Sequence, residues 1–206
     1  MKKSKSSSRW LQDHENDEFV RQARREGFRS RAVYKLIEID DRYNLLKPGM
    51  NVVDLGAAPG GWSQVAASRA SGGTVLALDL LEMAPLPGVT VIQGDFTEDA
   101  VFEQILAAIG DEPVDLVVSD MAPNLSGVKD IDQPRAMYLL ELALDFACSV
   151  LKPGGGLLMK GFEGEGIEAV RTLIRSNFKQ LRNTKPKASR GKSREIYLLG
   201  TGYKGG

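Results

Sequence analysis

Short apolar runs alternate with longer amphipathic segments along most of the chain. The apolar runs, which we expect to be strands, cover residues 51–55, 74–80, 89–93, 114–119, 156–160, 179–185 and 195–201. The segments between and before them are predicted helices at 17–26, 31–42, 62–69, 98–109, 133–151 and 167–177. Apolar strands that alternate with helices indicate a mostly parallel sheet covered on both faces. The last two runs are joined too closely for a helical crossover, so we expect an antiparallel final strand.

The segment before the first predicted strand differs from the rest. Residues 1–8 are rich in lysine and serine and are expected to be disordered, and residues 9–47 are interpreted as a basic helical region. We expect 1–206 to be a single domain, because domains average roughly 100–200 residues. No apolar run approaches the roughly 18 residues of a membrane span, and the basic start lacks the apolar core of a secretory signal. A cytoplasmic protein without a membrane partner is therefore predicted.

The formal net charge is zero, but the charge is unevenly distributed. Residues 1–35 carry +5 and residues 171–206 carry +9, which leaves −14 between them. Two basic ends on an acidic body favour a polyanionic partner, such as nucleic acid, over solvated surface charge. The candidate phosphate contacts are Arg29, Arg31, Lys185, Lys187, Arg190, Lys192 and Arg194.

The chain has one cysteine, Cys148, and one histidine, His14. This composition rules out an internal disulfide, and it argues against a zinc site and against histidine-based nucleophilic triads. We therefore expect no metal. The chemistry must rely on carboxylates, lysines, hydroxyls or a cofactor.

A glycine-rich loop, DLGAAPGGW at 54–62, follows the first predicted strand, and acids follow the next three. Asp79 ends the second strand, Asp95 follows the third and Asp120 ends the fourth. Ligands of open α/β sheets bind beyond the carboxyl ends of the strands. The loop glycine Gly56 and these acids are thus candidate cofactor contacts.

The loop does not fit a nicotinamide cofactor. The dinucleotide fingerprint is G-x-G-x-x-G, whereas Gly56 is followed by Ala-Ala-Pro. Acids at Asp54, Asp79 and Asp95 also make a poor setting for a diphosphate. They suit a ligand that has a ribose, an adenine and a cationic amino-acid tail, which favours S-adenosylmethionine.

Several motifs together resemble the FtsJ/RrmJ family of bacterial 2′-O-methyltransferases of large-subunit ribosomal RNA. The similarity extends from about residue 7 to residue 201. The motifs that carry it are RSRAVYKL at 29–36, DLGAAPGGWSQ at 54–64, SDMAPNLSG at 119–127, PRAMYLLELAL at 134–144, LLMKGFEGEG at 157–166 and SREIYLL at 193–199.

The resemblance implies a Rossmann-like S-adenosylmethionine-dependent methyltransferase fold, with a seven-stranded, mostly parallel sheet and one antiparallel strand. It implies methylation of a uridine ribose 2′-hydroxyl in 23S ribosomal RNA, with the large ribosomal subunit as partner, and we expect a monomer. The catalytic residues implied by motif are Lys35, Asp120, Lys160 and Glu195. The cofactor positions implied by motif are Gly60, Trp62, Asp79, Asp95 and Asp120. One departure is Gly161, where the family pattern leads us to expect a bulkier apolar residue.

The chemistry can be argued from the residues as well. Lys160 follows a buried strand, where desolvation and a nearby Lys35 would favour its neutral form. A neutral lysine can accept the 2′-hydroxyl proton, or it can hold the oxygen. Asp120 would orient Lys160, and Glu195 would position Lys35.

Three other functions remain open. They are the same chemistry on transfer RNA or an mRNA cap, a non-catalytic RNA-binding factor, and an oxidoreductase. Tyr197 and Phe162 could stack on a target nucleotide that has left its helix, although core packing is favoured for both.

Overall fold

The computed structural model describes residues 17–110, 113–123 and 126–206, so the expectations for residues 1–16 lie outside the described residues. The strands are β1 (Val52–Leu55), β2 (Val75–Asp79), β3 (Val89–Gln93), β4 (Val114–Ser119), β5 (Leu151–Phe162), β6 (Phe178–Thr184) and β7 (Glu195–Tyr203). The helices are α2 (Glu18–Glu26), α3 (Val33–Tyr43), α4 (Gly61–Arg69), α5 (Asp99–Ile109), α6 (Lys129–Val150) and α7 (Ile167–Asn177). In this part of the chain, no helix is both long enough and apolar enough to cross a membrane.

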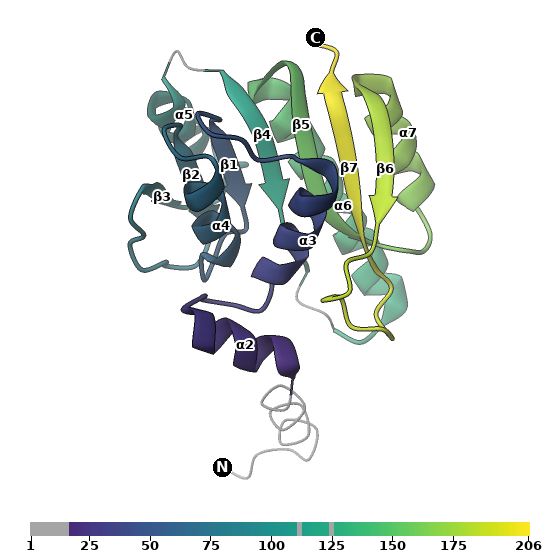
Figure 1. The fold of residues 1–206 in the computed structure, drawn as a ribbon. Coiled ribbons are helices and arrows are strands. Elements are labelled where there is room, and N and C mark those ends of the chain that lie inside the picture. Colours follow the sequence, from purple (N-terminus) through teal and green to yellow (C-terminus); the bar gives the residue numbers. More distant parts are fainter. Residues whose placement is uncertain (1–16, 111–112, 124–125) are drawn as a thin grey trace.

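All seven strands belong to one sheet, in the order β3-β2-β1-β4-β5-β7-β6 (Figure 1). The first five strands along that order pair in parallel, and β7 runs antiparallel to both β5 and β6. The predicted fold class is confirmed, including the antiparallel final strand. Because β7 is antiparallel, its first residue, Glu195, lies beside Phe162 at the end of β5.

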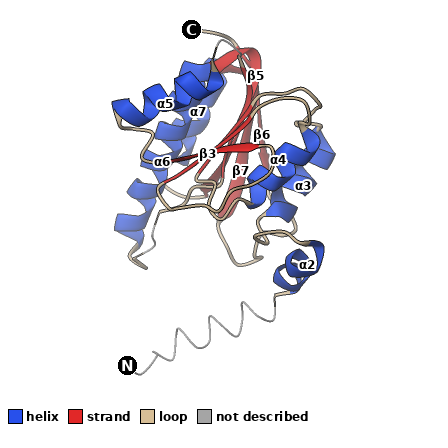
Figure 2. Ribbon diagram, turned by 90° about the vertical axis from the view of Figure 1, so that its left-hand side faces the viewer, coloured by secondary structure: helices blue, strands red, loops and turns tan. Residues whose placement is uncertain are grey.

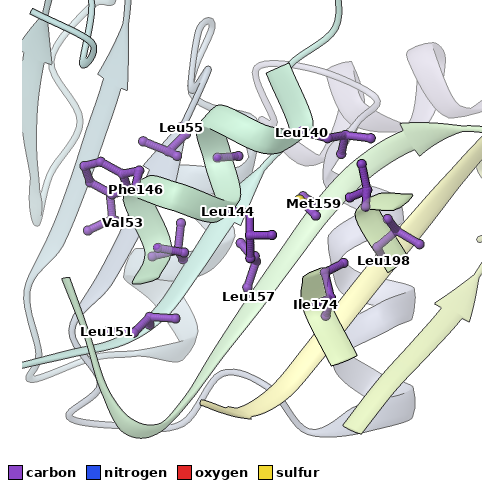
Figure 3. Close-up of a cluster of buried hydrophobic side chains, with 14 of the residues drawn as sticks. Val53, Leu55, Leu140, Leu144, Phe146, Leu151, Leu157, Met159, Ile174 and Leu198 are labelled. Carbon is purple, nitrogen blue, oxygen red and sulfur yellow. The ribbon is translucent and has the colours of Figure 1, made fainter. Parts of the chain in front are cut away.

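Helices cover both faces of the sheet, with α5, α6 and α7 on one side and α3 and α4 on the other (Figure 2). Successive residues of a strand point to opposite faces. Leu157 and Met159 accordingly belong to the core under α6 and α7, while Leu158 belongs to the core under α3 and α4. Figure 3 shows the first of these cores, in which Leu140 and Leu144 of α6 pack over β5.

The two N-terminal helices are held by well-formed ends. The Asp17 side chain accepts a hydrogen bond from the Phe19 N–H at 3.0 Å, and Gly27 ends α2 in the left-handed conformation with φ of 76°. These are the usual ways to satisfy the free backbone groups at helix ends. The chain then turns into α3, whose buried residues include Lys35.

Two predicted boundaries were wrong. Helix α6 begins at Lys129 rather than at 133, so Pro134 lies inside the helix. Strand β5 begins at Leu151 rather than at 156 and takes up the Lys-Pro-Gly-Gly segment that we expected to be a loop. A register shift between Val114 and Leu116 of β4 accommodates the extra residues, since Leu151 pairs with Val114 and Gly156 with Leu116.

Candidate active site

Lys35 and Glu195 form a nearly buried ion pair. The Lys35 Nζ lies 2.8 Å from the Glu195 Oε1, and the two side chains are 11% and 13% exposed. The Ser189 hydroxyl donates to the same oxygen at 2.8 Å. Burial opposes ionisation of Glu195, but the charge of Lys35 and the hydrogen bonds from Lys35 and Ser189, with a smaller contribution from Lys160, hold its pKa below the ordinary value.

Lys160 and Asp120 form a second pair beside the first. The Lys160 Nζ lies 3.0 Å from the Asp120 Oδ1 and also donates to the Asp120 carbonyl oxygen. The pairing of β4 with β5 explains this contact. Ser119 is aligned with Met159, so the residues that follow them, Asp120 and Lys160, lie side by side. The pair therefore sits where both strands reach the carboxyl edge of the sheet.

Tyr197 connects the two pairs. Its hydroxyl donates to the Asp120 Oδ1 at 2.8 Å and lies 3.2 Å from the Glu195 Oε1. Its ring centroid is 5.6 Å from the Lys35 Nζ and 5.8 Å from the Trp62 ring centroid. Burial, together with the charges of Asp120 and Glu195, raises the pKa of Tyr197 well above the ordinary value. The phenol therefore stays protonated and acts as a donor.

We had favoured core packing for Tyr197, and its side chain is fully buried. Its hydrogen bond to Asp120 and its contact with Glu195 were missed. One signal was available in the sequence: Tyr197 is two positions after Glu195 in a strand, so the two side chains share a face. Phe162, the other candidate for stacking, is partly buried against the core under α6 and α7.

A small cavity lies next to this network. It is bordered by the segment before α3, the loop after β1 and the end of β4. Its lining residues include Ala32, Asp54, Gly56, Trp62 and Asp120. The structure therefore brings four residues of the predicted active site, and several of the predicted cofactor positions, to one place.

Asp54 has the most unusual environment in this cavity. Its Oδ2 accepts a hydrogen bond from the Ser63 hydroxyl at 2.6 Å, whereas its Oδ1 is buried with no hydrogen-bond partner among the described residues. Burial, with smaller contributions from Asp120 and Asp79, raises the pKa of Asp54 to about 7. Buried polar atoms in proteins are nearly always paired. A cationic ligand group would satisfy this oxygen, which fits the amino-acid tail of S-adenosylmethionine.

The loop after β1 requires its glycines. Gly56 has φ of 72°, and a Cβ there would come 2.4 Å from the Met121 Cγ. Gly60 has φ of 106°, and a Cβ there would come 2.9 Å from the Arg29 Nη1. Trp62 follows this loop at the start of α4, and its indole N–H donates to the Ala32 carbonyl at 2.8 Å. This hydrogen bond connects the start of α4 with the segment that precedes α3.

The other two predicted cofactor acids are not among the lining residues of this cavity, although Asp79 contacts one of them, Ala58. Asp79 accepts backbone hydrogen bonds at 2.8 Å from Ala58 and from Leu81, so it ties together the loops after β1 and β2. Asp95 accepts from both the backbone N–H and the hydroxyl of Thr97. Their contacts with a cofactor stay predictions.

The seven basic residues proposed for phosphate contact divide into two groups. Arg29 and Lys185 donate to backbone carbonyls, and Arg31 contacts both Asp17 and the Ala188 carbonyl. The others are exposed on the loop between β6 and β7, and they are Lys187, Arg190, Lys192 and Arg194. Figure 1 shows this loop at the edge of the sheet where β4 and β5 end.

The sheet order, the antiparallel β7 and the glycine loop beside an acid-lined cavity are features of Rossmann-like methyltransferases. A sequence model of the FtsJ-like methyltransferase family matches residues 28–203. The chain therefore belongs to the FtsJ-like methyltransferase family.

Similar proteins agree with this assignment. The chain is 59% identical to the ribosomal RNA large subunit methyltransferase E of Pseudomonas aeruginosa strain PAO1, over the whole of both chains. It is 55% identical to the protein of that name from Methylobacillus flagellatus, over 97% of each chain. Among solved structures, a Plasmodium falciparum protein described as a ribosomal RNA methyltransferase superposes with a TM-score of 0.77 at 31% identity, over 87% of this chain and 100% of that one.

Proposed function

We propose that this methyltransferase uses S-adenosylmethionine to methylate the ribose 2′-hydroxyl of a uridine in 23S ribosomal RNA. The proposal depends above all on one observation. Two neighbouring ion pairs, Lys35 with Glu195 and Lys160 with Asp120, lie together, and Asp120 also lines the cavity. The names of the relatives support a ribosomal RNA of the large subunit as the substrate.

The residues around the cavity suit the proposed cofactor. When bound, S-adenosylmethionine supplies a methyl group that is already activated by a positively charged sulfur. Asp54 would accept from its ammonium group, and Gly56, Gly60 and Trp62 would form the adjoining wall. The predicted contacts of Asp79 and Asp95 with the adenosine part complete this assignment.

The two lysines would act on the ribose. Alignment of the reacting groups supplies much of the rate in a displacement reaction, so the first task is to fix the 2′-oxygen. Lys160 would contact this oxygen, either as the base that takes the proton or as the group that orients it. Asp120 holds Lys160 in place, while Glu195 does the same for Lys35. Tyr197 sets the spacing between the two carboxylates.

The RNA would approach the carboxyl edge of the sheet. The exposed basic residues on the loop between β6 and β7 can neutralise phosphates there. The side chains of Lys35 and Lys160 are only 11% and 9% exposed, so they cannot reach into an RNA helix. The target nucleotide would therefore have to leave its stack.

A labelling experiment tests the proposal. The purified chain is incubated with methyl-tritiated S-adenosylmethionine and with unmethylated large ribosomal subunits, free 23S RNA, transfer RNA or capped mRNA. The labelled RNA is then digested and mapped. We expect a single 2′-O-methyluridine in 23S RNA. Label in transfer RNA or the cap alone would favour the rival substrates, and no label in any RNA would favour a non-catalytic binding factor.

A further inference from the structure

The Arg29 side chain turns toward the protein and binds three backbone carbonyls. Its Nη1 donates to the Pro59 oxygen at 3.1 Å and to the Ala84 oxygen at 2.7 Å, and its Nη2 donates to the Pro85 oxygen at 2.7 Å. Both hydrogens on Nη1 and one on Nη2 are used by these bonds. The Nε–H and one hydrogen on Nη2 are left, so the main partners of this guanidinium are the protein's own carbonyls and not, as predicted from the sequence, a phosphate.

The three carbonyls come from two separate segments. Pro59 belongs to the loop after β1, which borders the cavity, and Ala84 and Pro85 belong to the segment after β2 that follows Asp79. The segment after β2 reaches the lining of the cavity through Met83, which packs with Ala57. Carbonyl oxygens that face one another repel, and a planar guanidinium with fixed donors is suited to bridge them.

The segment after β2 has other contacts with the loop after β1. Its buried Met83 side chain packs with Ala57, and Asp79, which precedes it, accepts a backbone hydrogen bond from that loop. Leu80 and Leu81, in contrast, are 66% and 68% exposed. The Arg29 guanidinium adds a charged link between this segment and the loop after β1.

The backbone of Arg29 is anchored independently of its side chain. Its N–H donates to the Gln64 Oε1 at 2.8 Å, and the Gln64 amide nitrogen donates to the Gly27 carbonyl at 3.1 Å. Loss of the guanidinium should therefore leave the connection between α2 and α3 in place while freeing the two segments.

We propose that Arg29 is a positioning residue for the cofactor, because it holds the two walls of the cofactor site at a fixed spacing. This inference rests on the proposed use of S-adenosylmethionine. It makes affinity for the cofactor depend on a residue outside the sheet, on the segment that leads into α3.

Calorimetric titration with S-adenosylmethionine tests the inference without any need for turnover. We expect Arg29→Ala to weaken cofactor binding at least about tenfold, since it removes several hydrogen bonds from a charged donor. Arg29→Lys should recover part of the affinity, because an ammonium keeps the charge but cannot span all three carbonyls. Arg25→Ala is the matched control, since it removes an exposed arginine from the last turn of α2, and it should bind like the wild type.

Kinetics and RNA binding separate positioning from phosphate contact. For Arg29→Ala we expect a higher KM for the cofactor, a kcat near the wild-type value at saturating cofactor, and an unchanged salt dependence of RNA binding. If Arg29→Ala keeps the wild-type affinity for the cofactor but binds RNA more weakly, this inference is overturned and the proposed function stands. A wild-type chain that binds no S-adenosylmethionine would overturn the proposed function and this inference with it.

Discussion

Each active-site lysine forms an ion pair with its own carboxylate. Lys35 is paired with Glu195 and Lys160 with Asp120, so the four groups carry no excess charge. Repulsion between the lysines, which we used to argue for a neutral Lys160, is therefore offset by two nearby anions. The hydroxyl of Tyr197 then keeps both carboxylates in place.

The first prediction concerns the group that contacts the ribose. We expect Lys160→Ala to abolish methyl transfer while cofactor affinity stays within about twofold of the wild type, because Asp54 and the loop after β1 are untouched. Transfer of tritiated methyl and calorimetric titration measure the two effects. Lys152→Ala is the matched control, since Lys152 is on the same strand at the opposite edge of the sheet, and it should retain turnover. Turnover in Lys160→Ala would remove Lys160 from the mechanism.

A second prediction follows from the raised pKa of Asp54, which is about 7. The carboxylate form should bind the cationic ligand, so affinity for S-adenosylmethionine should rise as the pH increases through 7. Proton release on binding, measured in buffers of different ionisation enthalpy, should accompany this rise. In Asp54→Asn, only the pH dependence that comes from the ligand itself should remain. Identical pH profiles for the two proteins would contradict the assignment.

The same shift predicts a change in stability without cofactor. Because the pKa of Asp54 is higher in the folded chain than the ordinary 3.8, its contribution to stability is present below pH 4 and is lost as the pH rises toward 7. A shift of this size corresponds to about 4 kcal/mol as an upper bound. Asp54→Asn should thus be more stable than the wild type at pH 8, as measured by urea unfolding, although it binds the cofactor less well.

At the scale of elements, the active site depends on the direction of one strand. Strand β7 is antiparallel to β5, so Tyr197 is opposite Lys160 and Glu195 is opposite Phe162. A parallel β7 would place Glu195 at the other edge of the sheet. The short connection in the sequence was enough to predict the direction, but it did not show that β7 lies between β5 and β6. The order agrees with burial, since β7 is buried along most of its length and β6 is mostly exposed. We did not use this difference in the sequence.

Several element ends were predicted from the pattern of apolar positions alone, among them both ends of β3, β4 and α7. The end of α2 was also predicted, and Gly27 stops the helix there. The start of α6 and the start of β5 were not, since Pro134 and the Lys-Pro-Gly-Gly segment are usual boundary signals. Pairing with β4 and packing under the sheet outweighed those local preferences.

A fourth prediction uses Gly161, the departure from the family pattern. A Cβ at this position would point away from the face of Lys160 and come 3.2 Å from the Leu140 Cδ1 and 3.4 Å from the Ile167 Cδ1. Both are terminal methyl groups, which can shift slightly. Glycine inside a strand costs roughly 0.5–1 kcal/mol relative to alanine. We therefore expect Gly161→Ala to raise the free energy of unfolding by about 0.5 kcal/mol, as measured by urea denaturation, with methylation near the wild-type rate. Destabilisation would show that Leu140 cannot move.

At the scale of the whole molecule, the motifs predicted which residues gather but not every role. Asp120, Lys160 and Glu195 meet because the ends of β4 and β5 and the start of β7 share one edge of the sheet, and helix α3 brings Lys35 to them. The internal contacts of Arg29 could not be foreseen, because its acceptors are backbone carbonyls. Every residue has such a carbonyl, so no sequence pattern marks it as an acceptor.

The uneven charge of the chain leads to the last prediction, on RNA binding. The loop between β6 and β7 lies against α3, since the Lys187 N–H donates to the Glu38 Oε2 at 2.7 Å. Ser189 on the same loop donates to Glu195, so the loop also contacts the active site. Each phosphate that is neutralised releases condensed counterions. Replacing Lys187 and Lys192 together with alanine should therefore weaken binding to a 23S RNA fragment. It should also lower the slope of log affinity against log salt by about 1.5.

The matched control removes the same charge from the opposite edge of the sheet. Lys152 near the start of β5 and Lys179 near the start of β6 are both exposed. Their double alanine variant has the net charge of the loop variant, so a long-range effect of charge alone would change both slopes equally. Filter binding over a series of salt concentrations distinguishes the two cases. If the loop contacts the RNA, only the loop variant should show a smaller slope of log affinity against log salt, because counterions are released only where phosphate and cation meet.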